Sequence, residues 1–188
     1  MAVRDIQEVA VFSPTPANRE RLAARVAAKH EIAARAVSSA EQASSALDLV
    51  ICAARSYDET PVLHGDWLAP GTTVVSIGST LPEQREVDPM TIERAGCIVA
   101  DMVEEVIQES GDMLAATAGG IDLSGRVSSL ADVVGGRCTG RDTPEQIVLY
   151  KSVGSALQDV VLAEYVFRRA QAEGLGVDLP LLVPSVSK

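Results

Sequence analysis

Positive charge is scarce in this sequence of 188 residues. Lys and Arg number 16 against 26 Asp and Glu, which gives a formal net charge of −10. A chain with this balance offers no cationic surface to a phosphate backbone, so we expect neither nucleic acid nor an anionic membrane as a partner. Long apolar runs are missing as well. The longest, residues 49–54, is far shorter than the roughly 20 residues that span a bilayer.

Cysteine is also rare. Cys52, Cys97 and Cys138 lie far apart and form no CxxC pair, so the sequence predicts neither a disulfide framework nor a zinc site, and we expect no bound metal. Charged residues interrupt the N-terminal segment at the positions where a signal peptide would need an apolar stretch. We therefore expect a reduced, cytoplasmic protein with an ordinary apolar core.

What the sequence does contain is a regular alternation of strands and helices. Runs rich in apolar and β-branched residues predict strands at residues 8–12, 33–37, 48–53, 72–77, 97–100 and 146–150. Capping residues and apolar spacing predict helices at residues 16–29, 39–46, 89–94, 103–109 and 152–173. The alternation predicts an α/β fold with a parallel sheet. The run at 48–53 is typical of a strand buried on both faces of such a sheet.

Small or hydroxylic residues follow the predicted strands. Ligands of an open parallel sheet bind beyond the carboxyl ends of its strands, so these positions form the candidate ligand edge. They are Ser13 and Thr15 after the first strand, Ala53, Ala54 and Ser56 after the third, and Gly78, Ser79 and Thr80 after the fourth. Such an edge suits a dinucleotide, although the same residue types also end strands that bind nothing.

The sequence lacks the glycine-rich phosphate loop that a dinucleotide site normally needs between a strand and a helix. One GxG sequence occurs at residues 174–176, but it follows a long predicted helix and precedes Pro180, which is the wrong context. The two histidines offer no clear replacement chemistry. His30 ends a predicted helix and His64 lies in a turn, and we expect neither to be catalytic.

Several segments, in the same order along the chain, resemble the ornithine cyclodeaminase/mu-crystallin family of NAD(P)-dependent proteins. The most specific is residues 150–159, YKSVGSALQD, which is similar to the family's F-K-S-x-G-x-A-x-[EQ]-D block. The other segments are residues 11–16, 48–56, 61–67, 70–71, 77–86 and 109–112. One such block alone would be weak, whereas seven in order make a specific match.

The resemblance implies a Rossmann-like parallel sheet that lacks its first strand and the GxGxxA turn. Residues 1–116 would be a partial dinucleotide-binding domain, 117–145 a glycine-rich connection, and 146–188 a C-terminal strand, long helix and tail returning to an absent dimerisation domain. We expect a truncated gene model, a split gene or a fragment. In the strand order 3-2-1-4-5-6 the first strand is central, so its loss leaves two half-sheets with open edges. Such a chain should be poorly stable or self-associate.

By the same resemblance, ten residues would bind the cofactor. Ser13, Pro14 and Thr15 would hold the adenosine ribose or its 2′-phosphate, Ala53 and Ala54 the adenine, and Ile77, Gly78 and Ser79 the nicotinamide, while Lys151 and Ser152 would close over it. An exposed strand-end lysine is the alternative for Lys151. The cofactor would be NAD(H) or NADP(H), and the absence of an arginine at Pro14 slightly favours NAD(H).

The catalytic residue stays unassigned, because Thr80 occupies the position of the aspartate that the cyclodeaminase branch uses. A hydroxyl is a poor substitute for a carboxylate in proton transfer. The resemblance implies that the full-length protein is an oxidoreductase or cyclodeaminase that acts on a small amino acid or its cyclic imine by hydride transfer at the α-carbon, working as a homodimer, and that the 188-residue chain alone is inactive. Two alternatives remain open: a non-catalytic binder of cofactor and ligand, of the mu-crystallin type, and an inactive fragment.

Overall fold

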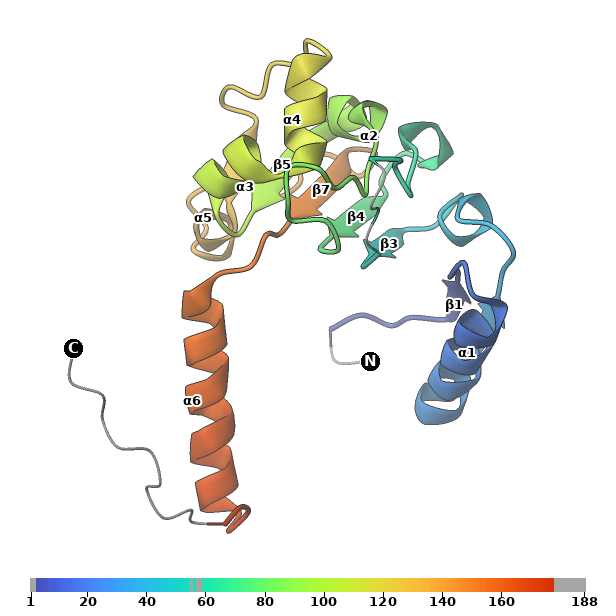
Figure 1. The fold of residues 1–188 in the computed structure, drawn as a ribbon, viewed down its shortest axis with the longest axis vertical. Helices are drawn as coiled ribbons and strands as arrows, with labels where there is room; N and C mark the ends of the chain where they lie inside the picture. Colours follow the sequence, from blue (N-terminus) through green and yellow to red (C-terminus); the bar gives the residue numbers. More distant parts are fainter. Residues whose placement is uncertain (1–2, 55, 57–58, 178–188) are drawn as a thin grey trace, which may run out of the picture. The chain divides into compact units, whose positions relative to one another are not determined.

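The computed structural model describes residues 3–54, 56 and 59–177 (Figure 1). The chain divides into two compact units, residues 1–154 and 155–188. The first unit contains two parallel sheets with helices between their strands, and this confirms the α/β class. None of the helices in the described part of the chain is long and apolar enough to cross a membrane.

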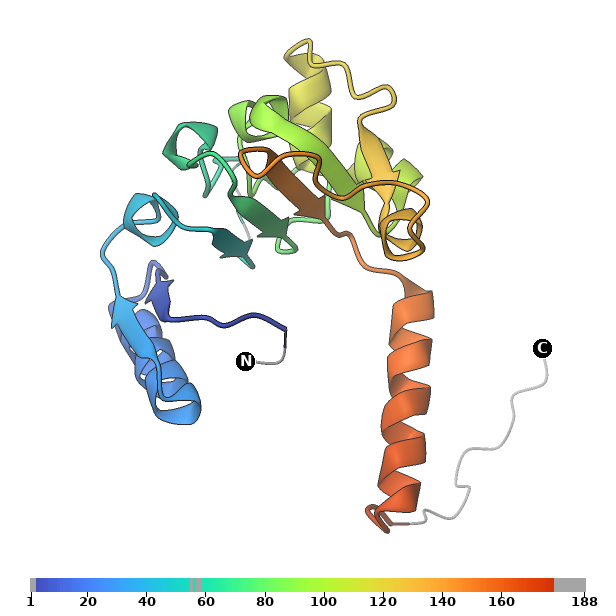
Figure 2. The ribbon, with the colours of Figure 1, turned by 180° about the vertical axis from the view of Figure 1, so that it is seen from behind.

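The larger sheet has five strands in the order β3-β4-β7-β5-β6, and every neighbouring pair is parallel (Figures 1 and 2). Its strands are β3 (Leu49–Cys52), β4 (Thr73–Ser76), β5 (Ala95–Ala100), β6 (Val127–Ser129) and β7 (Ile147–Lys151). The helical elements that accompany it are η2 (Gly65–Trp67), α2 (Pro89–Arg94), α3 (Val103–Glu109), α4 (Gly111–Ala118) and α5 (Leu130–Val134).

The smaller sheet has two parallel strands, β1 (Glu8–Val11) and β2 (Ala33–Ala36), joined by α1 (Pro16–His30). The short η1 (Glu41–Ala43) is all that forms of the helix expected at 39–46. Because β1 pairs with β2 and β3 belongs to the other sheet, the expected division into two half-sheets is confirmed. In the described residues β3 is an edge strand, with β4 as its one partner.

The place of β7 differs from the sequence expectation. The sequence pattern groups this strand with the C-terminal helix, whereas the structure inserts it between β4 and β5, with Leu149 opposite Val74 on one side and Ile98 on the other. Its first three residues are buried, as suits a central strand. Sequence order alone could not reveal this insertion, because pairing between strands so far apart in the chain depends on the packing of the whole sheet.

The glycine-rich connection also contains more structure than expected. Strand β6 and helix α5 form within it, and Ser129 caps α5 by accepting a hydrogen bond from the backbone of Asp132. Upstream, Gly111 begins a second helix where the sequence suggested only the end of the first. A Cβ atom on Gly111 would lie 2.0 Å from the carbonyl oxygen of Gln84, so glycine permits this close approach of α4 to the preceding loop.

The core of the first unit lies on one face of the larger sheet. Fully buried side chains there include Val74, Ile92, Ile98, Val106, Met113 and Leu149. The expectation that the run at 48–53 is buried on both faces is wrong. Val50 and Cys52 are buried, but Leu49 and Ile51 are 39% and 62% exposed. The strand alternates because nothing in the described part of the chain covers its second face.

The second unit is built on α6 (Ala156–Ala172), which confirms the long C-terminal helix. Ser155 caps it by accepting a hydrogen bond from the backbone N–H of Gln158. None of its residues is buried. Its exposed apolar side chains, each more than half exposed, are Leu157, Val160, Val161, Leu162, Tyr165, Val166 and Phe167. A single exposed apolar residue is ordinary, but a contiguous group of this size favours association.

The exposed apolar face of α6 predicts that the purified 188-residue chain self-associates. Replacing Val161 and Phe167 by Glu should weaken the association at least ten-fold, because burying such side chains contributes about 1.5–3 kcal/mol each. Sedimentation velocity over a concentration series measures this. The matched control Gln158→Glu adds charge to the same helix and should change little. A parent chain that stays monomeric and unfolds in one sharp transition would contradict the prediction.

Candidate functional site

The candidate site lies at the carboxyl edge of the five-stranded sheet. Because all five strands are parallel, the turns that follow β3, β4, β7 and β5 meet along this edge. Cys52 pairs with Ser76, and Ser76 pairs with Lys151, so the predicted residues after these strands come together. The residues brought together are Ala53, Ala54, Ile77, Gly78, Ser79, Lys151 and Ser152.

The turns after β3 and β4 are in direct backbone contact. The backbone N–H of Ile77 donates to the carbonyl oxygen of Cys52 at 3.0 Å. A Cβ atom on Gly78 would lie 2.0 Å from the carbonyl oxygen of Ala54. Only glycine fits there, so the two turns form one continuous, closely packed surface.

A buried carboxylate, Glu86, joins these two turns. Its Oε1 accepts a hydrogen bond from the backbone N–H of Ala54 at 2.8 Å, and its Oε2 accepts one from the backbone N–H of Gly78 at 2.9 Å. Oε2 also accepts from the hydroxyl of Ser76 at 2.6 Å. The side chain is fully buried. In the sequence Glu86 is only one residue of the matching segment 77–86, and no pattern there indicates its role.

Lys151 lies in the same buried cluster. Its ammonium donates to Asp112 Oδ2 at 2.5 Å, to the carbonyl oxygen of Ser79 at 2.7 Å and to Ser76 Oγ at 3.0 Å. The three donors of the ammonium are thus all used, and the side chain is 0% exposed. The exposed strand-end lysine is therefore excluded. The ammonium lies beneath the turns, and the expectation that it closes over a cofactor receives no support from this position.

Asp112, in the first turn of α4, completes the cluster. Its Oδ1 accepts hydrogen bonds from the backbone N–H groups of Glu86 at 2.7 Å and Val87 at 3.2 Å. The cluster also acts on the neighbouring thiol of Cys52. Burial and then the negative charge of Glu86 raise the pKa of Cys52 to about 12, although Lys151 lowers it. The thiol therefore stays protonated and is no nucleophile.

The backbone of Ser79 is hydrogen-bonded within the cluster, whereas its side-chain hydroxyl is not. Its carbonyl oxygen accepts from Lys151, but its hydroxyl, buried and inside the described part of the chain, has no hydrogen-bond partner there. Buried polar groups in proteins are nearly always paired. The hydroxyl is therefore available to a ligand that reaches this turn. Thr80 follows, with its backbone N–H held by the side chain of Gln84 at 3.1 Å.

Asp101 holds the turn after β7, and sequence reasoning missed it although it directly follows a predicted strand. It accepts hydrogen bonds from the hydroxyl of Ser152 at 2.6 Å and from the backbone N–H groups of Gly154 at 2.8 Å and Val153 at 3.2 Å. Burial works to raise the pKa of Asp101, but these bonds together lower it below its ordinary value. A pocket of about 710 Å³ lies beside it, beyond β5 and β6.

The remaining predicted residues, Ser13, Pro14 and Thr15, follow β1 in the smaller sheet. Thr15 occupies the position before α1, and its side chain makes no capping bond to the helix. The guanidinium of Arg19 donates to the carbonyl oxygen of Ser13 at 3.1 Å. Arg19 thus fixes the turn in this structure.

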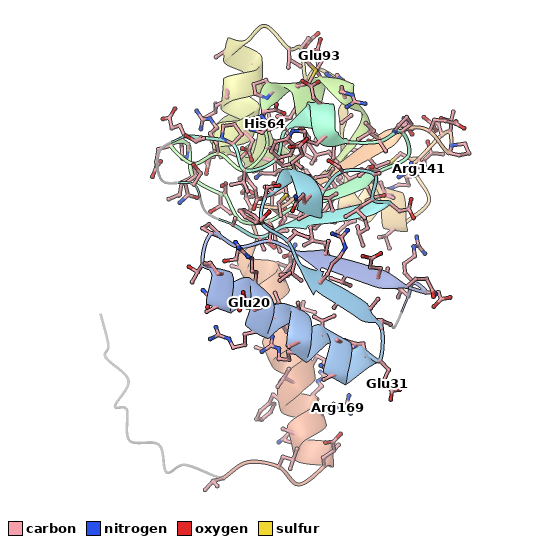
Figure 3. The ribbon with its side chains drawn as sticks, turned by 90° about the vertical axis from the view of Figure 1, so that its right-hand side faces the viewer. Glu20, Glu31, His64, Glu93, Arg141 and Arg169 are labelled. Atoms are coloured by element: carbon pink, nitrogen blue, oxygen red, sulfur yellow. The ribbon has the colours of Figure 1, made fainter. Side chains whose placement is uncertain are left out.

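His64 packs in a local turn (Figure 3). Its Nδ1 lies 3.2 Å from Asp88 Oδ2, and its ring meets the ring of Trp67 edge-on, with centroids 4.6 Å apart. Asp88 in turn caps α2 through the backbone N–H of Thr91. Across the described residues, no three His, Cys, Asp or Glu side chains gather closely enough to hold a metal ion.

The fold and this edge define a class: a parallel α/β protein in which a set of small turns at the carboxyl edge of the sheet is supported from beneath by a buried ionic cluster. The comparisons are more specific. Residues 1–174 match the model of the ornithine cyclodeaminase/mu-crystallin family. The chain therefore belongs to that family, which confirms the resemblance seen in its sequence.

Two curated relatives illustrate the match. The chain is 28% identical over 176 residues to the Delta(1)-pyrroline-2-carboxylate reductase of Bacillus cereus, covering 93% of this chain and 53% of the relative. It is 29% identical over 161 residues to the ketimine reductase mu-crystallin of Mus musculus, covering 86% of this chain and 47% of the relative. The chain thus spans about half the length of these proteins.

A solved structure agrees. The Delta(1)-pyrroline-2-carboxylate reductase of Thermococcus litoralis, in complex with NADH and L-proline, superposes with a TM-score of 0.87 at 31% identity. The match covers 95% of this chain and 55% of that one. The likeness extends over nearly all of this chain, and the chain again spans only about half the length of the protein it matches.

Removing the ammonium of Lys151 should destabilise the fold strongly. Lys151→Met keeps the length of the side chain but leaves Asp112 buried without its charged partner, which costs about 3–5 kcal/mol. Denaturant unfolding measures the loss. The control Lys29→Met, on the exposed end of α1, should change the free energy of unfolding by less than about 1 kcal/mol. Equal midpoints for the two variants would contradict a structural ion pair.

The lowered pKa of Asp101 predicts a specific acid dependence. The unfolded chain binds the proton of Asp101 more readily than the folded one, so its contribution is present at neutral pH and is lost as the pH falls through the ordinary value of 3.8 and below. The difference in unfolding free energy between the parent and Asp101→Asn should shrink over this range. The control Asp5→Asn should show no such trend. A difference that is constant with pH would refute the prediction.

Proposed function

We propose that the protein is an NAD(P)-dependent reductase of a small cyclic imine derived from an amino acid. The observation that carries the proposal is the surface formed by the touching backbones of Ala54 and Gly78, with the unpartnered hydroxyl of Ser79 beside it. Small residues allow a flat ring to approach the backbone closely, and a buried hydroxyl without a partner offers it a hydrogen bond. The relatives named as reductases support the same reading.

The residues present fit the cofactor in part. In the proposal Ala53 and Ala54 line the adenine side and Ile77, Gly78 and Ser79 the nicotinamide side, while Ser152 borders the site. Ser13, Pro14 and Thr15 hold the adenosine ribose, and Pro14 in place of a basic residue favours NAD(H). The glycine-rich phosphate turn is not among the residues of this chain. A bound NAD(P)H would supply the hydride.

Reduction is favoured over cyclodeamination because of Thr80. Hydride addition to the α-carbon of a cyclic imine that is already protonated on its nitrogen gives a cyclic amino acid and NAD(P)+, with no proton donor needed at the site. Deamination of a diamino acid would additionally require the proton chemistry of a carboxylate at this turn, and a hydroxyl does that poorly. Thr80 also favours one alternative function, namely a protein that binds the cofactor and a ligand but does not convert the ligand.

The whole protein, in this proposal, is a cytoplasmic homodimer. Residues 1–116 contribute most of the dinucleotide-binding domain, 117–145 the connection and 146–188 the C-terminal segment. The exposed apolar face of α6 supports an assembly larger than one copy.

The test measures binding before turnover. Both the 188-residue chain and the longest in-frame chain that the gene encodes upstream of Met1 are titrated with NADH and NADPH, followed by nicotinamide fluorescence. Delta(1)-pyrroline-2-carboxylate is then added and the loss of reduced cofactor recorded, with ammonia release from ornithine as a second assay. We expect cofactor oxidation and no ammonia. Binding without oxidation would favour the non-catalytic alternative, and ammonia release would overturn the proposal.

Ser79→Ala sharpens the test, since it should move stability and affinity in opposite directions. Removing an unpartnered buried hydroxyl should leave the free energy of unfolding unchanged or slightly higher. Losing a hydrogen bond to the cofactor should weaken binding about five-fold, equivalent to about 1 kcal/mol. Ser45→Ala, at an exposed position, is the matched control. An unchanged Kd for Ser79→Ala would remove Ser79 from the cofactor site.

A further inference from the structure

We propose that Glu86 is the positioning residue of this edge: its single carboxylate fixes the turns after β3 and β4 relative to each other, and the Lys151–Asp112 pair holds the carboxylate in place. The inference rests on the proposed function, because the two turns are those assigned to the adenine and nicotinamide sides of the cofactor. Glu86 is buried and both of its carboxylate oxygens already accept hydrogen bonds from the chain itself, so it acts through the turns and touches no ligand.

The geometry at Glu86 links two strands through one group. Oε1 receives the N–H of Ala54, the second residue after β3, and Oε2 receives the N–H of Gly78, the second residue after β4. The two donors occupy equivalent places on neighbouring parallel strands. The last backbone hydrogen bond between the two segments runs from the N–H of Ile77 to the carbonyl oxygen of Cys52, and beyond it the carboxylate that spans both donors sets the separation of the two turns.

The chemistry requires a carboxylate in particular. Among the described residues, the Glu86 side chain has three hydrogen-bond contacts, from Ala54, Gly78 and the hydroxyl of Ser76, and it is the acceptor in each. A glutamine has the same shape but only one accepting oxygen. In either orientation its NH2 group would face one of the two backbone N–H groups, which would then be left without an acceptor.

A closed ring of hydrogen bonds holds Glu86 from the other side. The hydroxyl of Ser76 donates to Glu86 Oε2 and accepts from the ammonium of Lys151. Lys151 donates to Asp112, and Asp112 accepts from the backbone N–H of Glu86. Ser76, Glu86, Asp112 and Lys151 are each 0% exposed. The ring joins β4, the following loop, α4 and β7, so no member can shift without breaking a buried bond.

The same arrangement fixes the loop that carries Thr80. The carbonyl oxygen of Ser79 accepts from Lys151, and the backbone N–H of Gly111 donates to the carbonyl oxygen of Leu81 at 3.2 Å. The loop is therefore anchored both before and after Thr80. Positioning through Glu86 thus extends along the whole turn that the proposal places against the nicotinamide.

The experiment compares Glu86→Gln with Glu83→Gln, which makes the same chemical change at an exposed position of the same loop. It uses the chain that binds NADH or NADPH in the titration above. Amide hydrogen exchange reports on Ala54 and Gly78 directly. We expect exchange at one of these two amides to accelerate at least ten-fold in Glu86→Gln, and the Kd for the cofactor to rise about ten-fold. The core amides of Ile98 and Leu149 should stay protected, and Glu83→Gln should change nothing.

Glu86→Asp is the second variant. It keeps the charge and protects the fold better, but it is one methylene too short to reach both turns, so a positioning role predicts the same loss of affinity. Overturning results are normal exchange at both amides together with an unchanged Kd, or full rescue by Glu86→Asp. If the parent binds neither NADH nor NADPH, the proposed function fails, while the exchange measurement on the 188-residue chain still decides whether Glu86 holds the turns.

Discussion

The ammonium of Lys151, buried without access to water, is the constraint on which the rest of this edge depends. A charge in such a place is tolerated only when its donors are all matched, and here Asp112, Ser76 and the carbonyl of Ser79 match them. Ser76 and Ser79 belong to β4 and the turn after it, whereas Asp112 belongs to α4. The sheet order places β7 beside β4, and the start of a new helix at Gly111 places Asp112 in the buried cluster. Both arrangements are needed for the ammonium of Lys151 to reach its three partners.

The local features of the sequence predicted the local structure well. Apolar runs located the strands, and proline with its flanking residues located α2 at residues 89–94. The position of β7, the formation of β6 and the role of Glu86 could not be predicted in this way. Each depends on groups far apart in sequence, and a glutamate in a loop looks the same whether it is solvated or buried. The small turn residues were foreseen because strand ends are a local signal.

The exposed apolar side chains lie where the chain has no partner to bury them. Strand β3 alternates between buried and exposed residues, and α6 has an apolar face that the described residues leave uncovered. Sequence patterns record which side chains favour burial, whereas the structure records which of them the chain itself can bury. The difference between the two, at Leu49, Ile51 and along α6, identifies surfaces that other polypeptide would stabilise by covering them.

The carboxyl edge of the five-stranded sheet has two layers, a buried layer of charged groups and an outer layer of small neutral ones. Charge lies beneath, in Glu86, Asp112 and Lys151, where it fixes the turns, and the turns themselves present small neutral groups such as Gly78 and Ser79. A surface of that kind suits a reaction limited by the distance and angle between two carbon atoms, because rigid placement of the reactants lowers the barrier without a nearby ionisable group. Hydride transfer is such a reaction. Proton transfer is a different case, because it needs a titratable side chain at the reacting atoms. Thr80 is not such a side chain.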